Sequence, residues 1–200
     1  EVEEIKIGGI KFSSPQIKFI KSSGVFEKIF VDLQGENDFY KIVLDDEDNI
    51  KNFSLESNYI PGLLKIFDFD LNISRGSIKI EGKKNKSSDE YDGVIAGKNI
   101  VFFDAPFFAN FFSIFSLEGF AQKLKDGGII FNNLSANYKL VENRLKIVDS
   151  LLKGSELGIQ FDSVIGLDDD YFLMNGSIIP AYTLNTLITK FPIVGEIITA

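Results

Sequence analysis

The sequence predicts an α+β protein that is mainly β, an antiparallel meander of strands interrupted by a few apolar helices. Two observations predict this class. Apolar and polar residues alternate through most of the chain, and clusters of turn-forming residues recur at intervals of about ten residues. Three segments break the alternation with apolar residues at helical spacing, and we expect helices there, at about 61–68, 106–125 and 183–198.

The N-terminal half carries the first strands of the predicted meander. Gly8 and Gly9 separate two short strands, and the acidic run at 45–49 predicts a turn. Pro61 suits the first turn of the short helix, where a backbone N–H is not needed. The basic segment 82–88 predicts a solvated hairpin loop. We expect strands at 3–7, 10–12, 16–21, 25–33, 40–44, 53–57, 77–81, 91–96 and 99–103.

The central predicted helix, at 106–125, has a wide apolar face and only a thin polar stripe. Asp104 is a suitable N-cap, and Gly127 and Gly128 can supply the left-handed stop. The apolar face needs a large apolar partner. We favour the β-sheet of the same chain, and a lipid or membrane surface is the alternative. At the i, i+3, i+4 and i+7 spacing of one helix face lie Phe108, Phe111, Phe112 and Phe115, with Phe107 beside them.

The C-terminal half returns to the alternating pattern. Asp149 interrupts the alternation once, and Pro180 ends the last expected strand. We expect these strands at 134–140, 145–151, 157–161 and 171–178. The apolar helical region at 183–198 follows, and one of its faces carries Leu184, Leu187 and Ile188.

Composition excludes several functions. The 200 residues contain neither His nor Cys, which excludes common catalytic triads, thiol chemistry and common zinc sites. The formal net charge of −8 and the lack of a basic cluster argue against a nucleic-acid partner. We expect no enzyme activity, no cofactor and no metal. We expect a single domain over 1–200, weakly subdivided near 98, and we interpret a chain that begins at Glu1 as a segment of a larger protein.

Two passages resemble the C-terminal region of AsmA-like proteins, and more closely its YhdP-type branch in Gram-negative bacteria. The first is FFDAPFFANFFSIFSLEGFAQKLKDGGIIFNNLSANYKL at 102–140, a strand, an apolar helix, Leu-x-Gly, a second helix and a strand. The second is NGSIIPAYTLNTLITKFPIVGEIIT at 175–199, with its Pro-Ala-Tyr-x-Leu-Asn-x-Leu core and apolar Pro-Ile-Val-Gly turn. YIPGLLKIFDF at 59–69 resembles the short helix that precedes them.

The resemblance implies a long periplasmic protein of the cell envelope, anchored in the inner membrane. Its curved antiparallel meander would form a groove with an apolar inside, a bridge for phospholipid transport between the two membranes in outer-membrane biogenesis. The implied partners are phospholipid, neighbouring β-segments of the parent chain and a membrane surface. The family has no catalytic motif to carry over.

Elementary energetics agree with such a groove. Each CH₂ moved out of water is worth about 0.8 kcal/mol, so an acyl chain of about sixteen carbons resists aqueous transit by roughly 12 kcal/mol. Alternation places the apolar side chains of a meander on one face, which removes this barrier without chemistry. The lipid-contact candidates are Phe107, Phe108, Phe111, Phe112, Phe115, Leu184, Leu187 and Ile188.

Two other functions remain open from the sequence. The chain could be a structural or assembly cap that docks outer-membrane components through its apolar helices, without conducting lipid. It could also be a hydrolase or transferase of envelope glycans or lipids, which would need two converging carboxylates.

Overall fold

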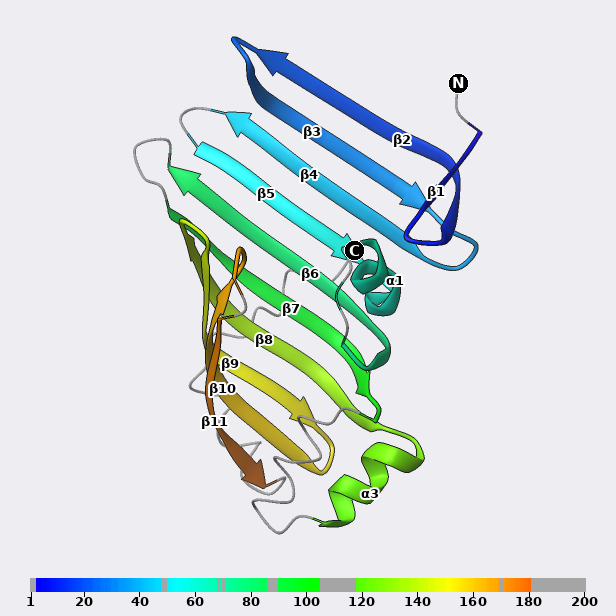
Figure 1. Ribbon diagram of the computed structural model, residues 1–200, viewed down its shortest axis with the longest axis vertical. Helices are drawn as coiled ribbons and strands as arrows, with labels where there is room; N and C mark the ends of the chain where they lie inside the picture. Colours follow the sequence, from blue (N-terminus) through cyan, green and yellow to red (C-terminus); the bar gives the residue numbers. More distant parts are fainter. Residues whose placement is uncertain are drawn as a thin grey trace.

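The computed structural model describes residues 3–47, 50–67, 69, 71–85, 90–104, 118–169 and 171–180. These residues form one sheet of eleven strands, whose order in space follows their order in the sequence (Figure 1). Every neighbouring pair is antiparallel, which confirms the predicted meander. The strands are β1 (Glu4–Ile7), β2 (Ile10–Ser22), β3 (Val25–Gln34), β4 (Phe39–Glu47), β5 (Ile50–Ser57), β6 (Ile73–Asn85), β7 (Glu90–Phe102), β8 (Ile129–Val141), β9 (Arg144–Gly154), β10 (Leu157–Gly166) and β11 (Phe172–Pro180).

The sheet is open, because β1 and β11 lie at its two edges and do not pair with each other. Its strands stack along the longest axis of the molecule, and β9–β11 turn away from the plane of the strands before them (Figure 1). Such curvature follows from the twist that each strand adds to the next. The helix α1 (Ile60–Ile66) lies on one face, which we call the inner face.

Several strands are longer than the sequence predicts. Asp45 and Asp46 belong to β4, although we expected a turn there, and Asp45 accepts a 2.6 Å hydrogen bond from Lys28 of β3. The expected basic loop begins later, since residues 82–85 continue β6. Cross-strand partners outweigh the low strand propensity of these charged residues. Strand β7 runs unbroken through Lys98.

Helix α1 confirms the short helix that Pro61 predicts, although it begins and ends slightly earlier than expected. Ile60 and Leu63 are buried against the sheet. The buried hydroxyl of Ser57 accepts a 3.0 Å hydrogen bond from the backbone N–H of Tyr59, which fixes the entry into the helix. This hydrogen bond and the two buried side chains hold the helix against the inner face.

Side chains of this chain cover one half of the inner face, the half at the end of β5 and the start of β6. Leu63 packs in a cluster with Phe12, Leu33, Tyr40 and Leu55. Phe12 arrives there on the β1–β2 hairpin, and its ring meets that of Tyr40 edge-on at 5.4 Å. A second cluster continues along the same half, toward β10, and is formed by Ile60, Ile100, Leu124, Ile129, Phe131, Leu152, Leu157 and Ile159.

Helix α3 (Glu118–Asp126) corresponds to the last part of the helix predicted at 106–125. Leu124 is its buried anchor, and Gly128 has the left-handed φ of 87° expected of the residue that ends a helix. The backbone N–H of Asp104 donates a 3.0 Å hydrogen bond to the carbonyl of Leu124. The earlier part of this predicted helix, and the helical region at 183–198, lie outside the described residues.

Candidate functional site

Alternation along the strands sorts apolar side chains onto the inner face. In register, Ile42 lies opposite both Val31 and Leu55, so the three form part of one row across the sheet. The row continues over the next three strands without a polar residue. Its members are Val31, Ile42, Leu55, Ile80, Ile95 and Ala136.

The outer face carries ion pairs instead. Lys28 pairs with Asp45 at 2.6 Å, and Lys139 pairs with Glu90 at 2.5 Å and with Asp92 at 3.1 Å. These groups are partly exposed, so each pair contributes little to stability, and their charges make this face hydrophilic. The sheet is therefore amphipathic, as the alternation predicts.

The half of the inner face that α1 leaves uncovered is an apolar groove. It holds a cavity of about 400 Å³ that crosses six consecutive strands, β4 to β9, and reaches the β10–β11 turn. The groove therefore runs across the strands and along the stacking direction of the sheet. All of its lining residues are aliphatic or aromatic: Leu44, Phe53, Ile80, Tyr91, Ile95, Tyr138, Leu140, Leu145 and Leu167.

Two glycines shape the floor of the groove. Gly93 lies opposite Gly82 on one side and opposite Tyr138 on the other. A β-carbon at either glycine would collide with the Tyr138 side chain, so that ring lies flat over both. Burial raises the pKa of the Tyr138 hydroxyl, and the neighbouring Tyr91 and Asp92 add to the shift. The phenol therefore stays neutral, as an apolar site requires.

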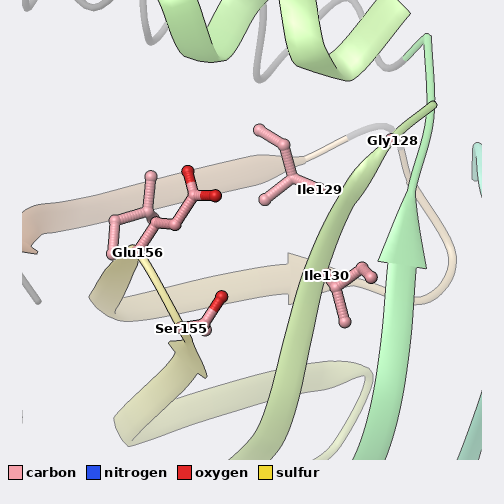
Figure 2. A pocket seen from close by; sticks show the side chains of 7 residues that line it. Gly128, Ile129, Ile130, Ser155 and Glu156 are labelled. Carbon is pink, nitrogen blue, oxygen red and sulfur yellow. The ribbon is translucent and has the colours of Figure 1, made fainter. Parts of the chain in front are cut away.

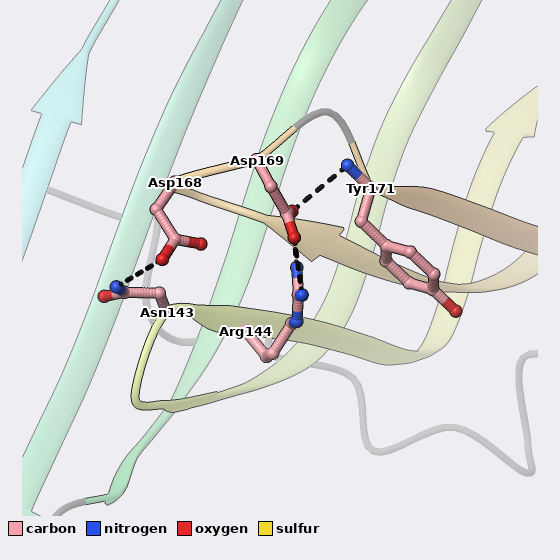
Figure 3. Close-up of polar contacts among 5 residues, drawn as sticks. All are labelled: Asn143, Arg144, Asp168, Asp169 and Tyr171. Carbon is pink, nitrogen blue, oxygen red and sulfur yellow. Dashed lines mark hydrogen bonds and ion pairs between the residues drawn. The ribbon is translucent and has the colours of Figure 1, made fainter.

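A polar clamp holds the end of the groove at the β10–β11 turn. Arg144 donates two 2.6 Å hydrogen bonds to the carboxylate of Asp169, and Asn143 donates one of 2.9 Å to Asp168 (Figure 3). The guanidinium also lies 5.0 Å from the ring centre of Tyr171. These contacts join the β8–β9 turn to the β10–β11 turn, and so they hold Leu167, which is 53% exposed, at the groove wall.

A second cavity, of about 250 Å³, lies at the opposite strand ends, between the start of β8 and the β9–β10 turn. Figure 2 shows Ile129 and Ile130 on one side of it and Ser155 and Glu156 on the other. Much of its wall is backbone, because Gly128 and Gly154 belong to the lining. It offers one carboxylate from Glu156 and little apolar surface, so the groove is the stronger candidate site.

The eight lipid-contact candidates predicted from sequence lie outside the described residues, and they stay a prediction. The residues that line the groove were not singled out from the sequence. Alternation placed their strands correctly, but only the register brings Phe53, Tyr91 and Tyr138 to one cavity. In the described ranges, no group of three or more Asp or Glu side chains is placed to hold a metal ion.

Within the described part of the chain, neither helix has the length and apolar character needed to cross a membrane. Comparison with protein families, curated proteins and solved structures finds no significant match to this chain.

Proposed function

We propose that this chain is a segment of a periplasmic lipid-bridge protein whose groove carries phospholipid acyl chains between the inner and outer membranes. The observation that carries the proposal is the apolar groove. Nine aliphatic or aromatic residues line it, and its course runs across the sheet instead of ending in a closed pocket. An acyl chain needs continuous apolar contact and no specific polar partner, and this surface offers that contact.

The dimensions suit a chain-like ligand. Six strands span about 24 Å, five spacings of about 4.8 Å each. An open meander can also be lengthened at its edges by neighbouring β-segments of a parent chain. On the β2 side, Ile17 and Phe19 are 47% and 57% exposed at such an edge. Added strands would cover this edge and continue the groove.

The resemblance to AsmA-like proteins supports the cellular setting of the proposal. It favours a parent chain anchored in the inner membrane, with phospholipid and a membrane surface as partners in outer-membrane biogenesis. Most of the groove lining lies outside the quoted motifs, and only Tyr138 and Leu140 belong to one of them.

Site-specific photocrosslinking tests the groove directly. We expect a photoreactive residue at Phe53 or Leu140, which face the groove, to crosslink to phospholipid in cells. Asn52 and Lys139 are the matched controls, because each is the sequence neighbour of a test position and points to the outer face. Equal crosslinking at test and control positions would contradict the proposal.

Extraction of the purified chain for mass spectrometry is the second test. We expect phospholipid to co-purify, and we expect the amount to fall when Leu140 is replaced by Gln but not when Lys139 is. A wild-type chain that carries no phospholipid, together with the absence of groove crosslinks, would overturn the proposal.

A structural or assembly cap is the second candidate, and one surface favours it. The segment after α1 exposes Phe67, Phe69 and Leu71, with exposed fractions of 48%, 60% and 57%. Surfaces of this kind often mark protein contacts. If Phe69→Asp abolishes binding to a defined outer-membrane component while no phospholipid is found in the groove, the function of the chain is that of an assembly cap and not of a lipid bridge.

A further inference from the structure

A row of charged residues borders the apolar groove on the inner face. Asp46 lies opposite Lys51 in register, and Lys51 lies opposite Lys84. Together with Glu27 these residues line a cavity of about 440 Å³. Along this border the sheet therefore presents two acidic side chains followed by two basic ones.

The charged row and the groove adjoin each other. Asp46 follows Leu44 by two residues on β4, and Lys51 precedes Phe53 by two residues on β5, so each pair shares the inner face. Leu44 and Phe53 both line the groove. The amine of Lys84 lies 5.4 Å from the ring centre of Tyr91, another groove residue. An amphiphile in the groove would thus place its polar end within reach of the row.

We infer that this row is the head-group site for a zwitterionic phospholipid whose acyl chain lies in the groove, an inference that rests on the proposed function. Lys51 and Lys84 receive the phosphate, and Asp46 and Glu27 receive the cationic substituent.

The charge order supports this assignment. Lys51 and Lys84 lie directly opposite each other on neighbouring strands, so their ammonium groups can contact the same ligand. A phosphate between the two ammonium groups accepts charge-assisted hydrogen bonds from both. The two acids at the other end of the row repel a purely anionic head group, so the row favours a ligand that carries both signs.

The test compares three lipids with the same acyl chains: phosphatidylethanolamine, phosphatidylglycerol and diacylglycerol. We expect the double variant Lys51→Gln, Lys84→Gln to bind phosphatidylethanolamine roughly tenfold more weakly than the wild-type chain, since two partly exposed charge-assisted contacts are lost. Diacylglycerol, which has no phosphate, should bind both proteins equally. Lys83→Gln is the matched control, because Lys83 precedes Lys84 and is exposed on the outer face. It should leave all three affinities unchanged.

The acidic half of the row has its own readout. Asp46→Asn should reduce the ratio of the affinity for phosphatidylethanolamine to that for phosphatidylglycerol. Lys51→Arg keeps the positive charge and should bind both lipids. Unchanged phosphatidylethanolamine affinity in the folded double variant overturns the head-group site and leaves the groove intact. A wild-type chain that binds none of the three lipids, diacylglycerol included, overturns the proposed function and the head-group site together.

Discussion

The hydroxyl of Tyr138 lies over Gly82, two strands away across the floor of the groove. Gly93 separates them in register, and its missing side chain gives the Tyr138 ring the space to lie flat. A ring held flat leaves the volume above it open. Two glycines and one tyrosine therefore create the middle of the groove, although all three lie in ordinary strands.

This relationship predicts a specific coupling. Gly82→Ala should destabilise the fold by about 1–3 kcal/mol, because the new methyl group collides with the Tyr138 hydroxyl. In a Tyr138→Phe background the nearest oxygen is gone, and the same substitution should cost at least about 1 kcal/mol less. Urea unfolding of the wild type, both single variants and the double variant measures the difference.

The control for this cycle is Gly119→Ala. Gly119 is an exposed helical residue with open space around its α-carbon, so alanine there should be neutral or stabilise by up to about 1 kcal/mol. An equal cost of Gly82→Ala in both Tyr138 backgrounds would refute the contact.

The packing of α1 predicts where the covered half of the inner face is most sensitive. Leu63 is 8% exposed in the cluster that includes Phe12 and Tyr40, so Leu63→Ala should destabilise by about 2–4 kcal/mol. Phe67→Ala, at the end of the same helix, removes a larger side chain that is 48% exposed, and it should cost less than 1 kcal/mol. Thermal unfolding of the two variants ranks them, and the reverse order would contradict the assigned core.

The sequence was sufficient for the meander and for α1, because both depend on local periodicity. Alternation in 134–140 and Pro61 with its apolar neighbours needs no knowledge of distant residues. The groove could not be predicted in the same way. Its walls depend on which residue of each strand lies opposite which, and one residue of slippage would turn Tyr138 to the outer face.

Bulges fix that register, and their sequence signals are weak. Ser14 has a φ of 49° at an irregularity in the pairing of β2 with β3, and Asp149 has a φ of 51° within β9, where the pairing with β8 shifts. The sequence marked Asp149 as an interruption but could not say in which direction the pairing shifts. Strand ends were also missed at Asp46 and Lys84, because cross-strand neighbours decide the pairing of such charged residues.

The clamp at the end of the groove predicts a dependence on pH. The hydrogen bonds from Arg144 hold the pKa of the Asp169 carboxyl below its ordinary value. A lowered pKa in the folded state contributes stability that is present above the unfolded pKa, near 4, and is lost as the pH falls through the folded value. The wild-type chain should therefore lose stability below about pH 4 in part through this group.

Asp169→Asn removes that contribution. The variant should have a lower Tm than the wild type at pH 7, and the two values should converge as the pH falls toward 2. Glu36→Gln, at an exposed position in the β3–β4 turn, is the control and should follow the wild-type curve. A constant difference between Asp169→Asn and the wild type at every pH would show that the lowered pKa does not stabilise the fold.

Two buried serines on the inner face should respond to alanine with opposite signs. Ser57, 1% exposed, exchanges hydrogen bonds with the backbone of Tyr59 at 3.0 and 3.3 Å, so Ser57→Ala should destabilise by about 1 kcal/mol. Ser150, 0% exposed, follows the Asp149 bulge, and its hydroxyl has no hydrogen-bond partner among the described residues. Burying a hydroxyl in this way carries a desolvation cost, so Ser150→Ala should stabilise the chain by about 1 kcal/mol. Because residue type and burial are matched, the sign of each change in urea unfolding reports hydrogen bonding alone, and a loss of stability in Ser150→Ala would mean that the hydroxyl is satisfied.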